Sequence, residues 1–248
     1  MFAISLISEL LGWKATGSVN IVIGTHFLTT MDFTGHFIMN ELMLVLIGIT
    51  LAIILNLFHG NDSQEQAIVT HMRDTEQKMQ DILAELAAFL MEEPSGKNVW
   101  DDIIGLEKEM QTYIHEAYEY QDNTFQSHPG YYIDYFEMRS NQCKVLHNLH
   151  YEMRRLRSMP VQAKVISQYI SYLKDYVIER NVPSRQIEAL KQIFIDMEQQ
   201  PLPVTRQEFE SRALLYHILM DLEVFLIFKR RFVEEMDPAI RKIYWNGE

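Results

Sequence analysis

The feature that most constrains this chain is a run of uncharged residues near its N-terminus. No formally charged side chain occurs within residues 42–58, LMLVLIGITLAIILNLF. A helix of this length is roughly 25 Å long, close to the hydrocarbon thickness of a bilayer. The run therefore predicts a membrane-spanning helix. A buried core helix of a soluble protein is the alternative, because the run lies at the short end of the transmembrane range.

Charged residues are distributed very unevenly along the chain. Only four of its 22 basic and 34 acidic residues occur before residue 61. A hydrophobic membrane segment joined to a water-soluble segment gives this asymmetry. We therefore predict a partial transmembrane domain over residues 1–60 and a soluble domain over residues 61–248.

Residues 15–31 form a second uncharged stretch, which is richer in Gly, Ser and Thr. On a helix, Gly17, Asn20 and Gly24 would fall within about 60° of one another. A small and weakly polar face of this kind suits close helix packing. Together with a polar turn at residues 32–36, the two uncharged stretches predict a transmembrane hairpin.

The helix that begins at Glu41 is expected to carry a polar stripe. Helical spacing places Glu41, Gly48, Ala52, Asn56 and His59 within less than about 100° of one another. Polar groups inside a membrane usually face the interior of a helix bundle or a water-filled path. We therefore assign Glu41 and Asn56 to a candidate substrate path, and Gly48 and Ala52, like Gly17 and Gly24, to helix packing. The alternative is that Glu41 and His59 mark the two interfacial ends of the helix.

The segment after residue 61 is predicted to be entirely helical, so the fold class is all-α, with about two transmembrane helices followed by an antiparallel helical bundle. Apolar residues there recur at spacings of three and four, and Pro, Gly and Asn clusters separate the periodic segments. A capping box at Thr205 and Glu208 opens the last helix. The residues placed on its apolar side are Phe209, Ala213, Leu214, His217, Met220, Phe225 and Phe228. The expected helices cover about 61–91, 98–125, 131–158, 160–177, 184–197 and 205–228.

The composition argues against several classes of function. A net charge of −12 disfavours nucleic acid and tight docking on anionic lipid. The lone Cys143 excludes an internal disulfide, and we find no phosphate-binding loop, nucleophile elbow or catalytic triad. His147 and His150, with His115 from a neighbouring helix, have a spacing that suits a metal, but chance produces such spacings easily. We therefore predict no enzyme activity, no metal and no cofactor.

Two basic clusters and many tyrosines remain to be assigned. The clusters could face anionic headgroups or an acidic sister surface, although solvated helix faces are the simpler interpretation. The tyrosines are expected to fill the bundle core with their hydroxyls at its rim, rather than to stack on an aromatic ligand. The basic residues are Arg154, Arg155, Arg157, Lys229, Arg230 and Arg231.

The order of segments resembles the aromatic acid exporter family of mostly Gram-positive bacteria. The resemblance rests on LLGWKATGSVNIVIGTHFLTT, FIMNELMLVLIGITLAIILNLFHG and MRDTEQKMQDILAELAAFL, and it is strongest over residues 40–56. It implies a multi-pass protein of the cell membrane with a helical, cytoplasmic C-terminal domain. No catalytic motif comes with the family.

Relative to that family, the chain starts at the last two or three membrane helices. Two spans cannot enclose a substrate site, because backbone and charged groups within a bilayer need surrounding protein. We therefore expect an N-terminally truncated product, or one that assembles with copies of itself or with a partner that supplies further membrane helices. The lipid bilayer is the other expected partner.

Two functions follow from these expectations. The first is export of small organic anions such as aromatic carboxylic acids, with the helical domain in a regulatory or assembly role. The second is a membrane-anchored helical scaffold or sensor without transport activity.

Overall fold

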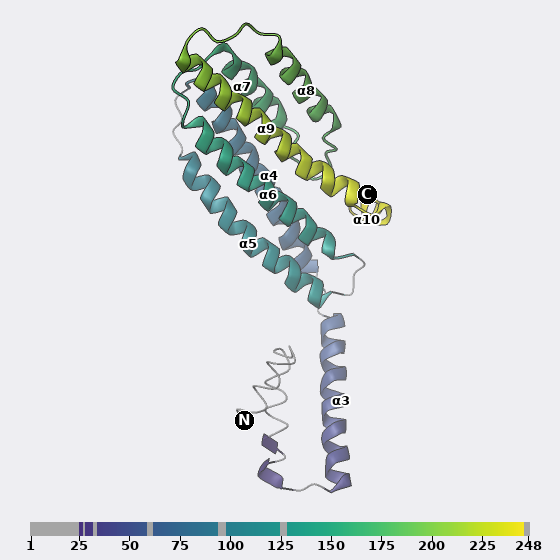
Figure 1. Ribbon diagram of the computed structural model, residues 1–248. Coiled ribbons are helices and arrows are strands. Elements are labelled where there is room, and N and C mark those ends of the chain that lie inside the picture. Colours follow the sequence, from purple (N-terminus) through teal and green to yellow (C-terminus); the bar gives the residue numbers. More distant parts are fainter. Residues whose placement is uncertain are drawn as a thin grey trace. The chain divides into compact units, whose positions relative to one another are not determined.

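The computed structural model describes residues 25–26, 28–31, 34–58, 62–93, 98–124 and 128–245. Over these residues the fold is all-α and contains no strand, as the sequence predicted (Figure 1). The chain divides into two compact units, Met1–Gly60 and Asn61–Glu248.

The long helix of the first unit is α3 (Gly35–Phe58). Its first turn is capped by Thr34, whose hydroxyl oxygen accepts a hydrogen bond of 3.4 Å from the N–H of Phe37. Before it, Thr25, His26 and residues 28–30 are helical, and Met31 turns the chain with a φ of 47°. None of the helices, over the residues that the structure describes, has the combined length and apolarity of a membrane span.

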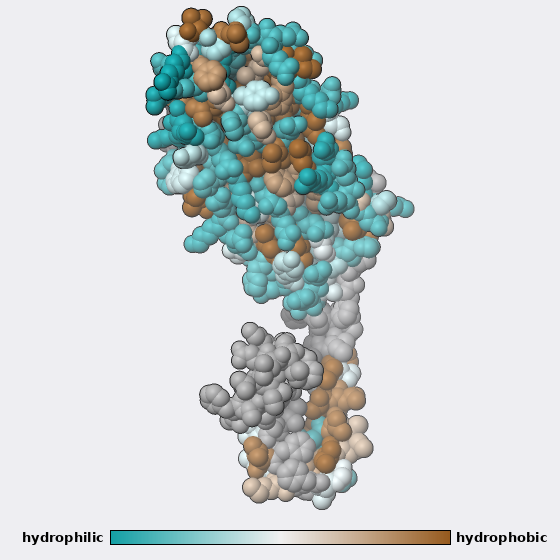
Figure 2. Space-filling view, in the orientation of Figure 1, coloured by the Kyte–Doolittle hydropathy of each residue, from teal (hydrophilic) through white to brown (hydrophobic). Residues whose placement is uncertain are grey.

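Large apolar side chains lie exposed along α3, where Figure 2 shows a strip of hydrophobic residues. A helix that faces water usually exposes polar residues, so an apolar surface of this extent is typical of an interaction site. The side chains at positions 52, 53 and 55–58 lie outside the described part of the chain. The exposed residues, at 40–61%, are Ile38, Met39, Leu42, Met43, Leu44, Leu46, Ile47, Ile49, Leu51 and Ile54.

The second unit is a bundle of long helices. Helix α4 packs against α5, α6 and α7, while α6 packs against α5 and α9 (Figure 1). The shorter α8 packs against α7 and α9. The elements are α4 (Asp62–Leu90), α5 (Val99–Asn123), α6 (Gly130–Met153), α7 (Val161–Lys174), α8 (Ser184–Glu198), α9 (Arg206–Glu235) and α10 (Pro238–Trp245).

Local sequence explains where most of these helices begin and end. Thr205 caps α9 by accepting from the N–H of Glu208 at 3.1 Å, which confirms the capping box. Helix α4 ends in a Schellman motif, in which Glu92 has a φ of 57° and the Glu93 N–H donates to the oxygen of Ala88 at 3.1 Å. Helix α6 ends at Met153, earlier than predicted, because Leu156 turns back to pack against the core.

The predicted apolar face of α9 is only partly the buried one. Phe225 lies in the core and Phe228 is partly buried against it, as predicted. Phe209 and Met220 are exposed instead, whereas Leu215 and Leu222, which were not placed on that face, lie in the core. This helix has apolar residues on two sides, so spacing alone did not identify the buried one. The error matters for the site, because the N-terminal part of the exposed side forms the wall of a groove.

Helix α10 was not predicted. It is held by aromatic contacts: the ring of Tyr244 stacks on Tyr131 with centroids 4.1 Å apart, and the indole N–H of Trp245 donates to the Tyr131 hydroxyl at 3.0 Å. Beneath it, burial lowers the pKa of Lys229, and the nearby charge of Arg139 lowers it further. The ammonium of Lys229 donates to the backbone oxygen of Glu179. The Nζ atom of Lys229 lies 5.0 Å from the ring centroid of Phe232 and 5.5 Å from that of Trp245, so aromatic rings cover this buried nitrogen.

Tyrosines fill the bundle core, and several of their hydroxyls bond to carboxylates. Tyr131 donates to Glu179 at 2.6 Å, and Tyr132 donates to Glu65 at 2.8 Å. Burial raises the pKa of both phenols, so they remain neutral donors. These bonds let large aromatic residues be buried without leaving a polar atom unsatisfied.

A buried ion pair links α4 with α6. The guanidinium of Arg139, 1% exposed, donates to Glu76 at 2.9 Å, to the Tyr135 hydroxyl at 3.1 Å and to Gln142 at 2.9 Å. Gln142 in turn donates to the backbone oxygen of Phe225 on α9 at 2.8 Å. The network therefore fixes the relative positions of α4, α6 and α9.

Replacing Glu76 with Ala should lower the free energy of unfolding by about 3–5 kcal/mol, because Arg139 would stay buried without its counter-charge. Chemical denaturation of the full chain, followed by circular dichroism, measures the change. Glu109→Ala is the matched control, since it removes an ion pair between α4 and α5 whose partners Lys78 and Glu109 are 39% and 38% exposed. That loss should not exceed about 1 kcal/mol. Equal losses for the two variants would contradict the assignment.

Candidate functional site

The first unit brings Glu41 and His26 together. Glu41 is 6% exposed, and its Oε1 lies 2.9 Å from Nδ1 of His26. The imidazole also lies near Phe37, with ring centroids 5.8 Å apart. The side chain of His26 is 50% exposed, so the pair has a covered carboxylate and an accessible imidazole.

His26 was not predicted as a site residue. Its position within the uncharged stretch of residues 15–31 was a usable signal, because an ionisable residue in such a stretch is expected to have a partner. Glu41 was predicted as a site residue from the sequence. Its partner was not, because that depends on how residues 15–31 pair with the helix that contains Glu41.

The other residues predicted in this unit are described only in part. Asn56 and Ala52 belong to α3, but their side chains lie outside the described residues, as do Gly17 and Gly24 entirely. A Cβ added to Gly48 would meet no neighbouring atom within 4 Å. The roles of these residues in a path or in packing therefore stay predictions.

The histidines weighed as metal ligands have separate neighbours. His147 lies 3.1 Å from Glu107, and the exposed His115 lies 3.4 Å from Glu119. The ring of His150 lies beside Trp100, with centroids 5.7 Å apart. Across the described ranges, no group of three or more His, Cys, Asp or Glu residues is arranged to hold a metal ion.

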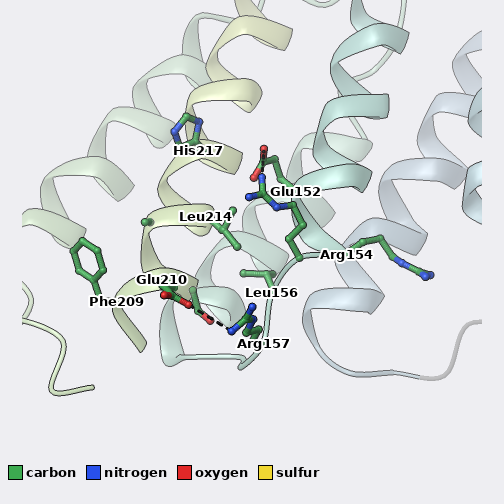
Figure 3. Close-up of a pocket in the computed structure, with 11 residues that line it drawn as sticks. Glu152, Arg154, Leu156, Arg157, Phe209, Glu210, Leu214 and His217 are labelled. Carbon is green, nitrogen blue, oxygen red and sulfur yellow. Dashed lines mark hydrogen bonds and ion pairs between the residues drawn. The ribbon is translucent and has the colours of Figure 1, made fainter. Parts of the chain in front are cut away.

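The basic cluster after α6 lies beside an open groove of about 740 Å³ (Figure 3). Its walls come from the α6–α7 connection and from the first half of α9. Leu156 and Leu214 supply apolar surface, while Phe209 and His217 come from the side of α9 that was predicted to be buried. The groove thus combines apolar surface with charged side chains.

The charges in this groove are paired, but loosely. Arg155 lies 3.5 Å from Glu152, and Arg157 lies 3.9 Å from Glu210. Both arginine side chains are exposed, so these pairs contribute little to stability and can exchange partners. The groove therefore presents a mixed surface rather than a concentrated positive one.

Arg154 behaves differently from the other arginines of the cluster. In Figure 3 its side chain extends away from the other labelled groove residues. It also lines a smaller pocket of about 220 Å³ between the end of α4, the start of α5 and the end of α6. Leu86, Phe89, Val99 and Met153 form the apolar wall of that pocket, and Glu85, Asn98, His150 and Arg154 are its polar lining.

The single cysteine of the chain lines neither of these two hollows. Cys143 is buried in the core, where burial and, to a lesser extent, Glu107 raise its pKa to about 12. Its thiol therefore remains protonated and inert at neutral pH. Both hollows are lined by cationic and apolar side chains, a combination that suits binding of an amphipathic anion.

The ionisation of His150 reports on Arg154. Burial lowers the pKa of His150, and the nearby charges of Arg154 and His147 lower it further. We expect Arg154→Gln to raise this pKa towards its usual value, because one of the three causes is removed. Arg155→Gln should leave it unchanged. NMR titration of the imidazole signals measures both, and an identical shift in the two variants would show that Arg154 has no special position.

The native pKa of His150 also affects stability. Because it lies below that of an unfolded histidine, the unfolded state binds more protons between the two values. This residue's contribution to the free energy of unfolding is therefore fully present above the unfolded pKa and is lost as the pH falls. His150→Gln should remove that component of the pH dependence, which denaturation at pH 7 and near pH 6 would measure.

Comparison with known proteins covers both units. Residues 65–230 match the family model described as "Putative aromatic acid exporter C-terminal domain", and residues 1–59 match "Aromatic acid exporter family member 1". The first match alone includes more than half of the chain. The family is a transporter family by description rather than an enzyme family.

Two relatives extend the comparison. The protein YqjA of Bacillus subtilis (strain 168), described as uncharacterized, is 27% identical over 216 residues, which cover 85% of this chain and 65% of YqjA. The chain thus spans about two thirds of that relative's length. The crystal structure of a protein from Clostridium difficile 630, described as a putative membrane protein, is 26% identical, with a TM-score of 0.61 over 68% of this chain and 98% of the other. This chain belongs to the aromatic acid exporter family.

Proposed function

We propose that this protein is a membrane transport protein, or part of one, that exports small organic anions such as aromatic carboxylic acids. The family supports the transport role. The observation that carries the proposal is the pair of Glu41 and His26, since the carboxylate is covered within an apolar unit and the imidazole is accessible. Ionisable residues in such surroundings commonly mark a transport path.

The pair also explains how an acidic residue can belong to a path for anions. An unpaired carboxylate would repel an anionic substrate, but Glu41 is 6% exposed and its Oε1 lies 2.9 Å from Nδ1 of His26. The half-exposed imidazole, rather than the carboxylate, is then the group that a substrate would meet. In this role Glu41 would position the imidazole, while Asn56 would supply a neutral hydrogen-bonding group farther along α3.

We further propose that α3 and residues 15–31 form a transmembrane hairpin. The support is the uncharged sequence of residues 42–58 and the exposure of the large apolar side chains on α3. Gly17, Gly24, Gly48 and Ala52 would serve the packing of these helices against others. Two spans do not enclose a path, so further membrane helices would come from a longer chain, from copies or from a partner. The helical unit would be cytoplasmic, with a regulatory or assembly role.

Export of an aromatic carboxylate by cells that carry the protein should fall by at least about tenfold in the variants Glu41→Ala, His26→Ala and Asn56→Leu, a factor equivalent to 1.4 kcal/mol. Efflux of radiolabelled 4-hydroxybenzoate from preloaded cells measures this. Leu44→Ala is the matched control, because Leu44 lies on α3 with an exposed side chain and should not affect efflux. Normal efflux in the Glu41 and His26 variants, at normal membrane levels, would refute the proposal.

The second candidate is a membrane-anchored scaffold or sensor that transports nothing. It is favoured by exposed apolar residues in the α8–α9 connection, where Leu202 and Val204 are 87% and 91% exposed. Under this alternative, Glu41→Ala and Asn56→Leu would leave the cell's phenotype unchanged. A double change of Leu202 and Val204 to Ser would alter it.

A further inference from the structure

We propose that the 220 Å³ pocket between α4, α5 and α6 is a binding site for a small aromatic carboxylate. It lies in the helical unit and is separate from any path along α3. The evidence for binding comes from the pocket alone. The further idea, that a molecule of the transported class regulates the protein by binding there, rests on the proposed function.

The size of the pocket limits the ligand. Its volume of about 220 Å³ lies below the roughly 300 Å³ at which pockets for drug-sized molecules begin. A single six-membered ring with one substituent is the appropriate scale, and a nucleotide is too large. The small volume also excludes a docked helix from another protein.

The walls favour an aromatic or otherwise flat apolar body. Leu86 and Met153 are buried and form the inner surface, while Phe89 and Val99 are partly buried beside them. The thioether of Met153 and the ring of Phe89 both make favourable contacts with an aromatic ring. The lowered pKa of His150 keeps its imidazole largely neutral near pH 7, so it adds a further aromatic surface.

A guanidinium at the same pocket supplies the charge that a carboxylate needs. Arg155 and Arg157 have carboxylate neighbours, but across the described ranges the guanidinium of Arg154 has no hydrogen bond or ion pair. Arginine binds carboxylates through two parallel hydrogen bonds, which gives both energy and orientation. Arg154 is exposed, so it can reach a ligand without losing an existing partner.

The remaining polar residues orient such a ligand. Glu85 would repel the carboxylate, so the ligand should direct its anionic end towards Arg154 and its ring towards Phe89 and Leu86. The amide nitrogen of Asn98 donates to Asp101 at 2.6 Å, and this hydrogen bond holds the Asn98 side chain at the start of α5. A bound ring would contact residues of all three helices at once and would tie α4 to α5 and α6.

The test uses the full chain in detergent micelles, with benzoate as the probe in isothermal titration calorimetry. Benzamide tests the need for charge, because it keeps the ring and lacks the carboxylate. Acetate tests the need for the ring. We expect saturable binding of benzoate, with affinities for benzamide and acetate lower by at least about tenfold.

Three variants locate the site. Arg154→Gln should weaken benzoate binding by at least about tenfold, whereas Arg155→Gln, one residue further on, should change it by less than about twofold. Val99→Phe should abolish binding by filling the pocket. Circular dichroism checks that each variant is folded. The ring of Trp100 lies 5.7 Å from that of His150, so benzoate should change its fluorescence. Trp100→Phe should remove that change, while Trp13 and Trp245 continue to emit.

The outcomes separate this inference from the transport proposal. The inference would be overturned if the wild-type chain showed no saturable binding of benzoate. Equal losses of benzoate affinity in Arg154→Gln and Arg155→Gln, or unchanged affinity in Val99→Phe, would also overturn it. The Glu41→Ala variant should bind benzoate normally even where it no longer exports. Binding that persists without export supports the site and, by itself, leaves the path along α3 to be judged by efflux.

Discussion

A guanidinium that is 1% exposed is tolerated only when acceptors replace the water it has lost, and in this protein they come from α4 and α6. Arg139 meets Glu76 across the bundle, and Gln142 passes the network on to the backbone of α9. Hydrophobic burial is non-directional and would accept several rotations of these helices. The directional bonds of Arg139 select one of them for α4 and α6, the two helices whose ends form most of the smaller pocket.

The positions of the helices were predictable because their boundaries are encoded locally. The capping box at Thr205 and the breaks around Pro160, Pro183 and Pro201 act within a few residues of where they occur. The buried side of α9 was not predictable by the same means, since apolar residues occur on two of its faces. Helix α10 is short, and its main contacts, through Tyr244 and Trp245, are with residues more than a hundred positions earlier.

The sites show the same division between local and long-range information. Glu41 was identified because a carboxylate beside an uncharged run is conspicuous, whereas His26 became its partner only through the turn between two segments. Arg154, Arg155 and Arg157 are nearly equivalent in sequence. The end of α6 at Met153 separates them, so Arg155 and Arg157 face acidic neighbours while Arg154 reaches a second pocket.

The net charge of the chain bears on how an anion can bind at all. With a charge of −12, the protein repels small anions at long range, although salt limits that repulsion to about 8 Å at physiological ionic strength. Attraction by one exposed guanidinium is then too weak to hold a simple ion such as acetate. Burial of a ring against Leu86, Phe89 and Met153 adds a term that does not depend on charge, at roughly 25 cal/mol per Å². An acidic protein can therefore retain an aromatic carboxylate while it excludes smaller anions, and the selectivity comes from the apolar wall rather than from the arginine.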